Sequence, residues 1–395
     1  MILTKKQEEG LQIAIQRFRN REKYTVIAGY AGVGKSELVR FIVNALYMEG
    51  VSEEDIAFCS YTGKAALVLQ QKGNKNAMTL HKLLYDSKPK ADGTFIHTPK
   101  LCLNYRIIII DECSMMPKTM MALLFKYPVY CIFCGDPFQL SPVDKNANNG
   151  LLDHPHIFLD EIMRQAAEND IIQLSMQIRE QNTLQPFKGH DAVVIRQKDL
   201  NTGVLQWGDQ ILCATNATRK GINSTMRRLL KRGAEPEDGD RVICLRNYDQ
   251  YGSTYGNFLV NGVTGILQHP FPGFVTFPRY LCSPNQIKTI RGVFIGDDGD
   301  NYGELSMDYN EIQTGETSFD APTLYKLRRN KKSKSLIPLE FTYGYAITVW
   351  KAQGSEWNKI VLIEEKFPFD KLEHLRYLYT GITRARDKVV VVLKD

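Results

Sequence analysis

The segment Gly29–Ser36 constrains the fold of this chain more than any other. It consists of Gly-Tyr-Ala-Gly-Val-Gly-Lys-Ser and matches the pattern G-x-x-x-x-G-K-[ST]. An apolar strand, Tyr24 to Ala28, precedes it, and a segment with helical periodicity, Glu37 to Met48, follows it. A chance glycine-rich turn would not need this strand–loop–helix setting. The pattern therefore predicts a phosphate-binding loop in an α/β domain, because backbone N–H groups and a helix N-terminus wrap a phosphate there.

Each part of this loop has an expected role. The glycines let backbone N–H groups approach the phosphates, the Lys35 ammonium reaches the outer phosphates, and the Ser36 hydroxyl binds Mg²⁺. We therefore assign nucleotide binding to these residues: Gly29, Gly32, Val33, Gly34, Lys35 and Ser36.

A second polar cluster follows the most apolar strand, Arg106 to Ile110. Asp111 follows directly, where its carboxylate is placed to hold Mg²⁺ through water, and Glu112 is placed to take a proton from an attacking water. Two solvated loop acids are the alternative, but an Asp-Glu pair downstream of a phosphate-binding loop is a specific combination. After a further strand, Gln139 offers an amide that can sense the γ-phosphate. Together these motifs predict ATP hydrolysis.

Composition limits the other classes of protein. The chain has 395 residues, of which 43% are hydrophobic and 24% charged, as is typical of globular domains. No apolar run approaches the roughly 20 residues that a membrane-spanning helix needs, and the N-terminus lacks an apolar signal core. We therefore expect a cytoplasmic protein with no membrane partner. The eight scattered cysteines fit reduced thiols, and Cys131 and Cys134 are expected to pack on opposite faces of a strand, not to bind metal.

The order of expected elements divides the chain. Residues 1–150 alternate strands and helices, which predicts a parallel sheet covered on both faces. A second alternating block covers 151–240 and 337–395, and short strands separated by Gly, Pro and Asn in 241–336 predict a β-rich insertion. Two prolines and an Asp92-Gly93 turn predict a projecting hairpin at about 85–100. The elements expected in the first block are Leu11–Phe18, Glu37–Met48 and Gly63–Gln71 as helices and Tyr24–Ala28, Ile56–Ser60, Arg106–Ile110 and Val129–Cys134 as strands.

About eight ordered segments resemble the motifs of one known family. Besides the phosphate-binding loop, they are Leu3-Thr4 with Gln7, YTGKAA at 61–66, TLH at 79–81, DECSM at 111–115, GDPFQLSPV at 135–143, Leu159 to Gln165, 346–356 and 379–385. The series resembles superfamily 1 helicases, nearest to the RecD and Dda-type 5′-to-3′ DNA helicases, and it covers nearly the whole chain. Such an ordered series is hard to obtain by chance.

The resemblance implies an architecture and an activity. The architecture is two RecA-like domains, at 1–150 and at 151–240 with 337–395, an SH3-like insertion at 241–336 and a pin hairpin. The activity is that of a monomeric ATP-dependent DNA helicase, with ATP and Mg²⁺ as cofactors, which translocates 5′ to 3′ on single-stranded DNA and unwinds a duplex fork. DNA replication, recombination and repair, with replication or recombination proteins as partners, are the processes implied. The compact layout suggests a phage or bacterial source.

The resemblance also extends the nucleotide site. Gln7 looks like the adenine-reading residue of the family, and Gly354 and Glu356 would lie at the ATP cleft. Arg164 and Arg384 belong to the second alternating block, so these cations would reach ATP only when the two blocks close. Hydrolysis would then be a switch for domain movement. Arg386 is interpreted as a surface charge.

A third set of residues is expected to touch DNA. In the family, the matching motifs grip the single-strand backbone, and the corresponding residues here are Thr62, Lys64, Thr79, His81, Thr348 and Lys351. Thr79 as a helix N-cap and His81 as a core histidine remain alternatives. Phe95, near the hairpin tip, is the candidate wedge at the fork, or else it packs the hairpin against the first domain. Trp350 replaces the histidine common in relatives, and either packs in the core or stacks on a base.

Several alternatives stay open. The cationic run Lys326–Lys334 is ordinarily a solvated loop, and in this context it can also touch DNA. An RNA helicase, or a translocase that does not separate strands, has the same motifs, because groups that contact phosphates do not read the 2′-hydroxyl. A nucleic-acid clamp without turnover is disfavoured because Glu112 and both arginines are present.

Overall fold

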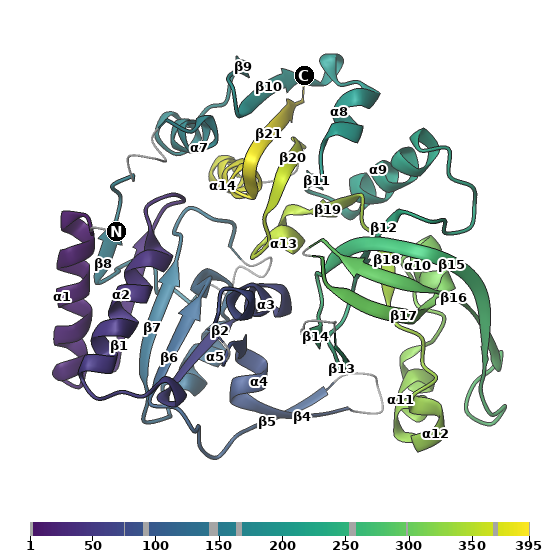
Figure 1. Cartoon of the computed structure of the whole chain (residues 1–395), viewed down its shortest axis with the longest axis horizontal. Coiled ribbons are helices and arrows are strands. Elements are labelled where there is room, and N and C mark those ends of the chain that lie inside the picture. The colour runs from purple at the N-terminus through teal and green to yellow at the C-terminus, as the bar shows by residue number, and fades with distance from the viewer. Residues whose placement is uncertain are drawn as a thin grey trace. The chain divides into compact units, whose positions relative to one another are not determined.

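A computed structural model describes residues 3–74, 76–89, 95–141, 149–162, 168–252, 258–297, 299–365 and 370–394. The contacts among its residues divide the chain into two compact units (Figure 1). The first unit consists of 1–84, 99–215 and 348–395, and the second of 85–98 and 216–347. The two β-sheets that dominate the first unit carry the candidate site.

The first of these sheets has six parallel strands in the order β3-β2-β6-β7-β1-β8. Its strands are β1 (Tyr24–Gly29), β2 (Ile56–Ser60), β3 (Met78–Thr79), β6 (Ile107–Asp111), β7 (Tyr130–Gly135) and β8 (Ile157–Leu159). Its helices are α1 (Lys5–Arg19), α2 (Lys35–Met48), α3 (Gly63–Gln71), α4 (Leu80–Leu84) and α5 (Lys118–Leu124). The four isoleucines of β6 are at most 2% exposed, as expected for a parallel strand covered on both faces. The predicted parallel sheet is confirmed.

Helices α1 and α2 pack together against this sheet (Figure 1). Helix α1 begins after Thr4, whose hydroxyl accepts a hydrogen bond from the Gln7 N–H while the Gln7 side chain accepts one from the Thr4 N–H. This reciprocal capping satisfies two N–H groups that the helix itself cannot pair. Leu38 and Ile42 of α2 form one buried cluster with Ile27 of β1. The cluster fixes the strand and the helix on either side of the phosphate-binding loop.

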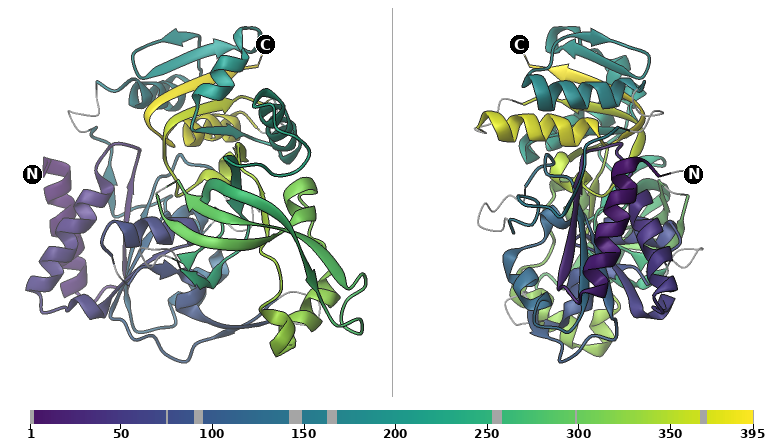
Figure 2. Two further views of the ribbon diagram at one scale, coloured as in Figure 1. Left: turned by 45° about the vertical axis from the view of Figure 1, so that its right-hand side comes forward. Right: turned by 90° about the vertical axis from the view of Figure 1, so that its left-hand side faces the viewer.

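The second sheet of the first unit has the order β19-β11-β20-β21-β10-β9. Its strands are β9 (Phe187–Lys188), β10 (Ala192–Arg196), β11 (Gln210–Cys213), β19 (Ala346–Thr348), β20 (Trp357–Ile363) and β21 (Ala385–Leu393), and its helices are α7 (Asp170–Gln181), α8 (Thr202–Trp207), α13 (Val349–Ala352) and α14 (Lys371–Ile382). The pairs β11–β20, β20–β21 and β21–β10 are parallel, whereas β9 is antiparallel. The C-terminal strand β21 thus pairs with β10, nearly two hundred residues earlier in the chain (Figure 2).

The second unit is built on a five-stranded antiparallel sheet in the order β17-β16-β15-β12-β18. Its elements are β12 (Asp240–Cys244), β15 (Thr264–Thr276), β16 (Gln286–Gly296), β17 (Asn301–Asp308), β18 (Phe341–Tyr343), the pair β13 (Tyr248–Gly252) and β14 (Phe258–Leu259), the hairpin β4 (Tyr85–Pro89) and β5 (Phe95–Pro99), and the helices α9 (Asn216–Leu229), α10 (Tyr309–Thr314), α11 (Ala321–Arg329) and α12 (Lys331–Lys334). The strands agree with the β-rich character expected for 241–336. The SH3-like label and the domain boundaries stay predictions.

The loop interpretation of the cationic run is wrong, and its contact with DNA stays a prediction. The cationic run Lys326–Lys334 forms the end of α11 and all of α12, not a solvated loop. The Asp320 carboxylate caps α11 by accepting a hydrogen bond from the Thr323 N–H at 2.8 Å, and Leu327 is completely buried. The high density of charges concealed an amphipathic helix.

Other predicted helices and strands have bounds that agree with the structure to within a few residues. The helix Gly63–Gln71 and the strand Ile56–Ser60 have the predicted bounds, whereas α1 begins at Lys5, earlier than predicted. Cys131 and Cys134 are 0% and 2% exposed in β7, in agreement with core packing. Within the described ranges, no helix combines the length and the apolar character needed to cross a membrane.

Candidate nucleotide-binding site

Three strands of the first sheet end at the same edge. Ala28 of β1 pairs with Gly135 of β7, and Ile110 of β6 pairs with Phe133 of β7. The phosphate-binding loop, the Asp111-Glu112 pair and the segment after Gly135 therefore leave the sheet side by side. The carboxyl edge of a parallel sheet is the usual ligand site in open α/β folds.

The phosphate-binding loop closes around the Lys35 side chain. Its ammonium donates hydrogen bonds to the Gly29 and Tyr30 carbonyl oxygens at 2.7 and 2.8 Å. Gly32 and Gly34 have φ values of 77° and 78°, in the left-handed region that favours glycine, and Gly34 is the N-cap of α2. This backbone course is the one that the Gly-x-Gly-Lys part of the pattern predicts.

Gln7 hydrogen-bonds the backbone at the end of the phosphate-binding loop. Its amide nitrogen donates to the Val33 and Gly34 carbonyl oxygens at 3.4 and 3.3 Å, and the residue is 1% exposed. The Val33 side chain is also buried, in the cluster beneath the loop, so only its backbone is available to a ligand. The adenine-reading role of Gln7 stays a prediction.

The two acids of the next strand end lie against a cation from the second sheet. The Asp111 carboxylate accepts a hydrogen bond from the Glu112 N–H at 2.9 Å, and Glu112 has a φ of 52°. The Arg384 guanidinium, which follows α14, is 4.0 Å from the Glu112 carboxylate and only 6% of the residue is exposed. Burial raises the pKa of Glu112, the nearby Arg384 lowers it, and the Asp111 charge raises it, with a net upward shift. A carboxylate with a raised pKa is a better proton acceptor.

Gln139 also lies in this region. Its amide oxygen is buried and has no hydrogen-bond partner among the described residues. The residue is 7% exposed. A buried amide oxygen without a partner is costly, and such groups are common where a ligand or an ordered water completes the site. The γ-phosphate role predicted for Gln139 would use this free acceptor.

Sequence reasoning missed the side chains that join the two sheets of the first unit. The Leu140 N–H donates to the Thr380 hydroxyl at 2.9 Å, and the Gln353 amide nitrogen donates to the Leu140 carbonyl at 3.0 Å. The Tyr379 hydroxyl donates to Asp136 at 2.6 Å. Thr380, Gln353 and Tyr379 all fall inside the motif-like segments, so their position in these segments was the available signal. Their partners were not deducible, because each pair is more than two hundred residues apart in sequence.

Gly354 makes a close approach to the first sheet's helix α3. It has a φ of 75°, and a Cβ placed on it would lie 2.5 Å from the Ala65 Cβ. Glu356 instead points outward: its carboxylate is 3.7 Å from the Arg386 guanidinium, and both side chains are more than half exposed. Arg386 thus has the surface position that was expected, and the nucleotide role of Glu356 stays a prediction.

The residues expected to grip DNA lie mostly at helix starts. The Thr62 hydroxyl accepts from the Ala65 N–H and caps α3, and the Thr79 hydroxyl accepts from the Lys82 N–H at the start of α4. Thr79 is therefore a helix cap, one of the two roles considered for it. The His81 ring lies 5.7 Å from that of Tyr61.

The remaining members of this set differ in exposure. Lys64 and Thr348 are each 9% exposed, whereas Lys351 is exposed. Trp350 is half-buried, with its ring centroid 6.5 Å from that of Tyr377 on α14, which supports packing. Arg164 and the side chain of Phe95 lie outside the described residues, as does the Asp92-Gly93 turn, so their roles stay predictions.

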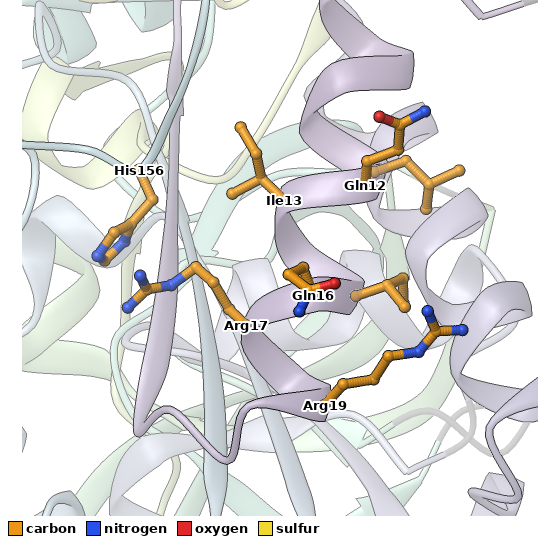
Figure 3. Close-up of a pocket in the computed structure, with 8 residues that line it drawn as sticks. Gln12, Ile13, Gln16, Arg17, Arg19 and His156 are labelled. Atoms are coloured by element: carbon orange, nitrogen blue, oxygen red, sulfur yellow. The ribbon is translucent and has the colours of Figure 1, made fainter.

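A separate hollow lies on the outer side of α1 (Figure 3). It is lined by Leu11, Gln12, Ile13, Ile15, Gln16, Arg17, Arg19 and His156. None of these is a predicted site residue. The hollow is therefore distinct from the nucleotide site.

The donors at the carboxyl edge fit Mg²⁺. Ser36 is the second residue of α2, and Asp111 is the last residue of β6. No group of three or more His, Cys, Asp or Glu side chains suited to a metal ion occurs in the described part of the chain. Mg²⁺ in phosphate-transfer sites needs only one or two carboxylates, with substrate phosphates and waters as the other ligands. One carboxylate and one hydroxyl beside a phosphate-binding loop match that requirement.

Two family models and several known proteins resemble this chain. A family model described as an AAA domain matches residues 3–197, and a UvrD-like helicase C-terminal domain matches 343–392. The "ATP-dependent RecD2 DNA helicase" of Deinococcus radiodurans is 25% identical over 385 residues, which cover 93% of this chain and 46% of the relative. The "ATP-dependent DNA helicase dda" of Enterobacteria phage T4 is 27% identical over 156 residues, 38% of this chain and 35% of the relative. The chain thus spans less than half the length of these relatives.

Solved structures give the same fold. The Pif1 helicase from Candida albicans has a TM-score of 0.54 at 18% identity, over 99% of this chain and 94% of that one. A Bacteroides Pif1 helicase in complex with ADP-AlF3 and single-stranded DNA has a TM-score of 0.54 at 18% identity, over 99% and 92%. The chain therefore shares the fold of these solved structures, with RecA-like domains. The motif-based resemblance to superfamily 1 DNA helicases of the RecD and Dda type is confirmed.

Proposed function

We propose that this protein is an ATP-dependent DNA helicase. The observation that supports it most directly is the meeting of Glu112 and Arg384 at 4.0 Å, because the two side chains come from the two different sheets of the first unit. A general base on one sheet and a cation on the other form one hydrolytic centre only while the sheets are together. Hydrolysis and product release remove the phosphate that both sheets would contact, so the sheets can separate. In this way a nucleotide drives domain movement.

The chain's own residues divide the work. Lys35 and the loop backbone bind the phosphates, Glu112 accepts the proton of the attacking water, and Gln139 orients that water or the γ-phosphate. Arg384, with Arg164 as the proposed second cation, stabilises charge that develops in the transition state. Mg²⁺, held by Ser36 and Asp111, would neutralise phosphate charge. Gln7, Gly354 and Glu356 are proposed to bind the rest of the nucleotide.

The proposed track for single-stranded DNA follows the caps of α3 and α4 and continues to Thr348 and Lys351. Hydroxyl groups and N–H groups at helix starts suit phosphate contact without sequence readout. We propose 5′-to-3′ movement, with Phe95 of the 85–100 hairpin as the wedge at the fork. The domain division stated above, a monomeric state, replication or recombination partners and a phage or bacterial cytoplasm are parts of the same proposal.

The deciding experiment compares duplexes that carry a 5′ or a 3′ single-stranded tail, incubated with the protein, ATP and Mg²⁺. The proposal expects strand separation from the 5′ tail only, and none with the Lys35→Ala variant. ATP hydrolysis stimulated by single-stranded DNA without separation would indicate a translocase. Stronger stimulation by RNA than by DNA of the same sequence would indicate an RNA helicase. No nucleic-acid-stimulated hydrolysis at all would overturn the proposal.

A further inference from the structure

Tyr379 lies where the phosphate-binding loop, the end of β7 and helix α14 meet. Its hydroxyl accepts a hydrogen bond from the Ala31 N–H at 2.8 Å and donates one to the Asp136 carboxylate at 2.6 Å. The other oxygen of Asp136 accepts from the Phe138 N–H at 2.9 Å. One hydroxyl therefore connects the loop to the segment that contains Gln139.

The Tyr30–Ala31 peptide is held from both of its sides. Its carbonyl oxygen accepts a hydrogen bond from the Lys35 ammonium at 2.8 Å, and its N–H is the group that donates to Tyr379. A peptide unit is planar, so its carbonyl and its N–H turn together. The orientation that Tyr379 imposes on the N–H is therefore also the orientation of a carbonyl that holds Lys35.

The Tyr379 side chain is closely packed. The residue is completely buried, and its ring packs edge-on against that of Phe138 with centroids 5.2 Å apart. Burial and the neighbouring Asp136 charge raise the pKa of the Tyr379 phenol well above its ordinary value, so the hydroxyl keeps the proton that it donates. The Arg179 guanidinium of α7 lies 3.6 Å from the centre of the Tyr30 ring. Two side chains from helices that accompany the second sheet, Arg179 of α7 and Tyr379 of α14, thus contact adjacent residues of the loop.

We propose that Tyr379 is a positioning residue of the ATPase centre, which sets the direction of the Lys35 ammonium through the Tyr30–Ala31 peptide and couples it to the position of Asp136. The Tyr379 hydroxyl is hydrogen-bonded to the loop and to Asp136, so Tyr379 acts through these groups. The expected effect of Tyr379 on turnover rests on the proposed function. Its expected effect on the conformation of the loop does not.

The consequence for catalysis follows from geometry. Lys35 must be aimed at the outer phosphates when charge develops there, and a misplacement of about 1 Å in such a group can slow a reaction on the order of 100-fold. Binding of ATP depends on the whole loop and on several N–H groups, so it is less sensitive. Loss of the Tyr379 hydroxyl should lower kcat much more than it raises KM.

The test compares Tyr379→Phe with Tyr377→Phe. Tyr377 belongs to the same helix, is also completely buried, and donates its hydroxyl to the Ile363 carbonyl at 2.6 Å, within the second sheet. Both variants remove one buried hydroxyl and retain the ring. Melting temperature, DNA-stimulated kcat and KM for ATP, and hydrogen exchange of a peptide covering 29–36 are measured for both and for the unaltered protein.

The expected result is that Tyr379→Phe lowers kcat by about 10- to 100-fold with little change in KM and accelerates exchange in the loop, while Tyr377→Phe leaves kcat and exchange unchanged and lowers the melting temperature by a similar amount. Equal kcat and equal loop exchange in Tyr379→Phe and the unaltered protein would overturn the inference. So would equal losses in both variants, since these would show only a loss of stability. An unaltered protein without ATPase activity would contradict the proposed function, and loop exchange would still decide the role of Tyr379.

Discussion

Gly354→Ala tests the close approach between the segment after α13 and the start of α3. At φ 75° any residue other than glycine is strained, which costs about 1–2 kcal/mol. The added methyl group would also lie 2.5 Å from the Ala65 Cβ and 3.2 Å from its Cα. Ala65 belongs to α3 and is 7% exposed, so it cannot move away without moving the helix. Overpacking of this kind costs about 1–3 kcal/mol, which gives a total of about 2–5 kcal/mol.

Gly50→Ala is the matched control. Gly50 has a φ of 80° and no heavy atom within 4 Å of an added Cβ, so it should show only the backbone strain of about 1–2 kcal/mol. Calorimetric unfolding of both variants separates the strain from the contact, and single-stranded DNA-stimulated ATPase activity reports on the displaced α3. We expect the larger destabilisation, and the loss of stimulation, only in Gly354→Ala. If Gly354→Ala were no less stable than Gly50→Ala, the steric conflict between an added Cβ and Ala65 would be refuted.

Four further outcomes are expected. Lys35→Ala should abolish DNA-stimulated ATPase activity because the cation that binds the outer phosphates is lost, and turnover near the unaltered rate would contradict this. Glu112→Gln should retain ATP binding, measured with a fluorescent analogue, but lose turnover, since an amide does not accept the proton. Arg384→Ala should lower turnover by about 10³- to 10⁵-fold with ATP binding largely intact, and a loss of affinity at an unchanged saturated rate would make it a ground-state ligand. The Val26 N–H donates to the His156 ring at 3.0 Å, and burial lowers the pKa of His156, so the folded protein binds fewer protons at this residue than the unfolded chain does. The melting temperature of the protein should therefore fall as the pH drops below about 6.5. It should fall less in His156→Asn.

The sheet that contains the phosphate-binding loop was predictable because its signals are local. Four consecutive isoleucines and the spacing of apolar residues in Gly63–Gln71 indicate a buried strand and a helix without reference to the rest of the chain. In the cationic run, local signals existed but were outweighed by charge: Asp320 with Pro322 is a helix start, and Leu324 and Leu327 are three residues apart on the buried side. A count of charges was the wrong criterion for that segment.

The sequence indicates which residues compose the candidate site, but it does not indicate how they come together. The pattern of the loop indicates Lys35 and Ser36 because the chemistry of phosphate binding demands those groups at that spacing. Nothing in the pattern states that the Tyr30–Ala31 peptide meets a tyrosine about 350 residues later. Such contacts depend on how two sheets pack, and packing is not encoded in the spacing of a single motif.

The spacing of the joining residues on α14 explains why one segment affects so many parts of the site. Arg376, Tyr379 and Thr380 are separated by three and four residues, so they share one face of the helix, and Arg384 continues that face just beyond its end. The Arg376 guanidinium bonds the Pro137 carbonyl at 3.3 Å, and the contacts of the other three residues are with the 136–141 segment, the phosphate-binding loop and Glu112. A rotation of α14 about its own axis would change all of these contacts together. We therefore expect a substitution on that face of the helix to affect turnover more than its contribution to stability suggests.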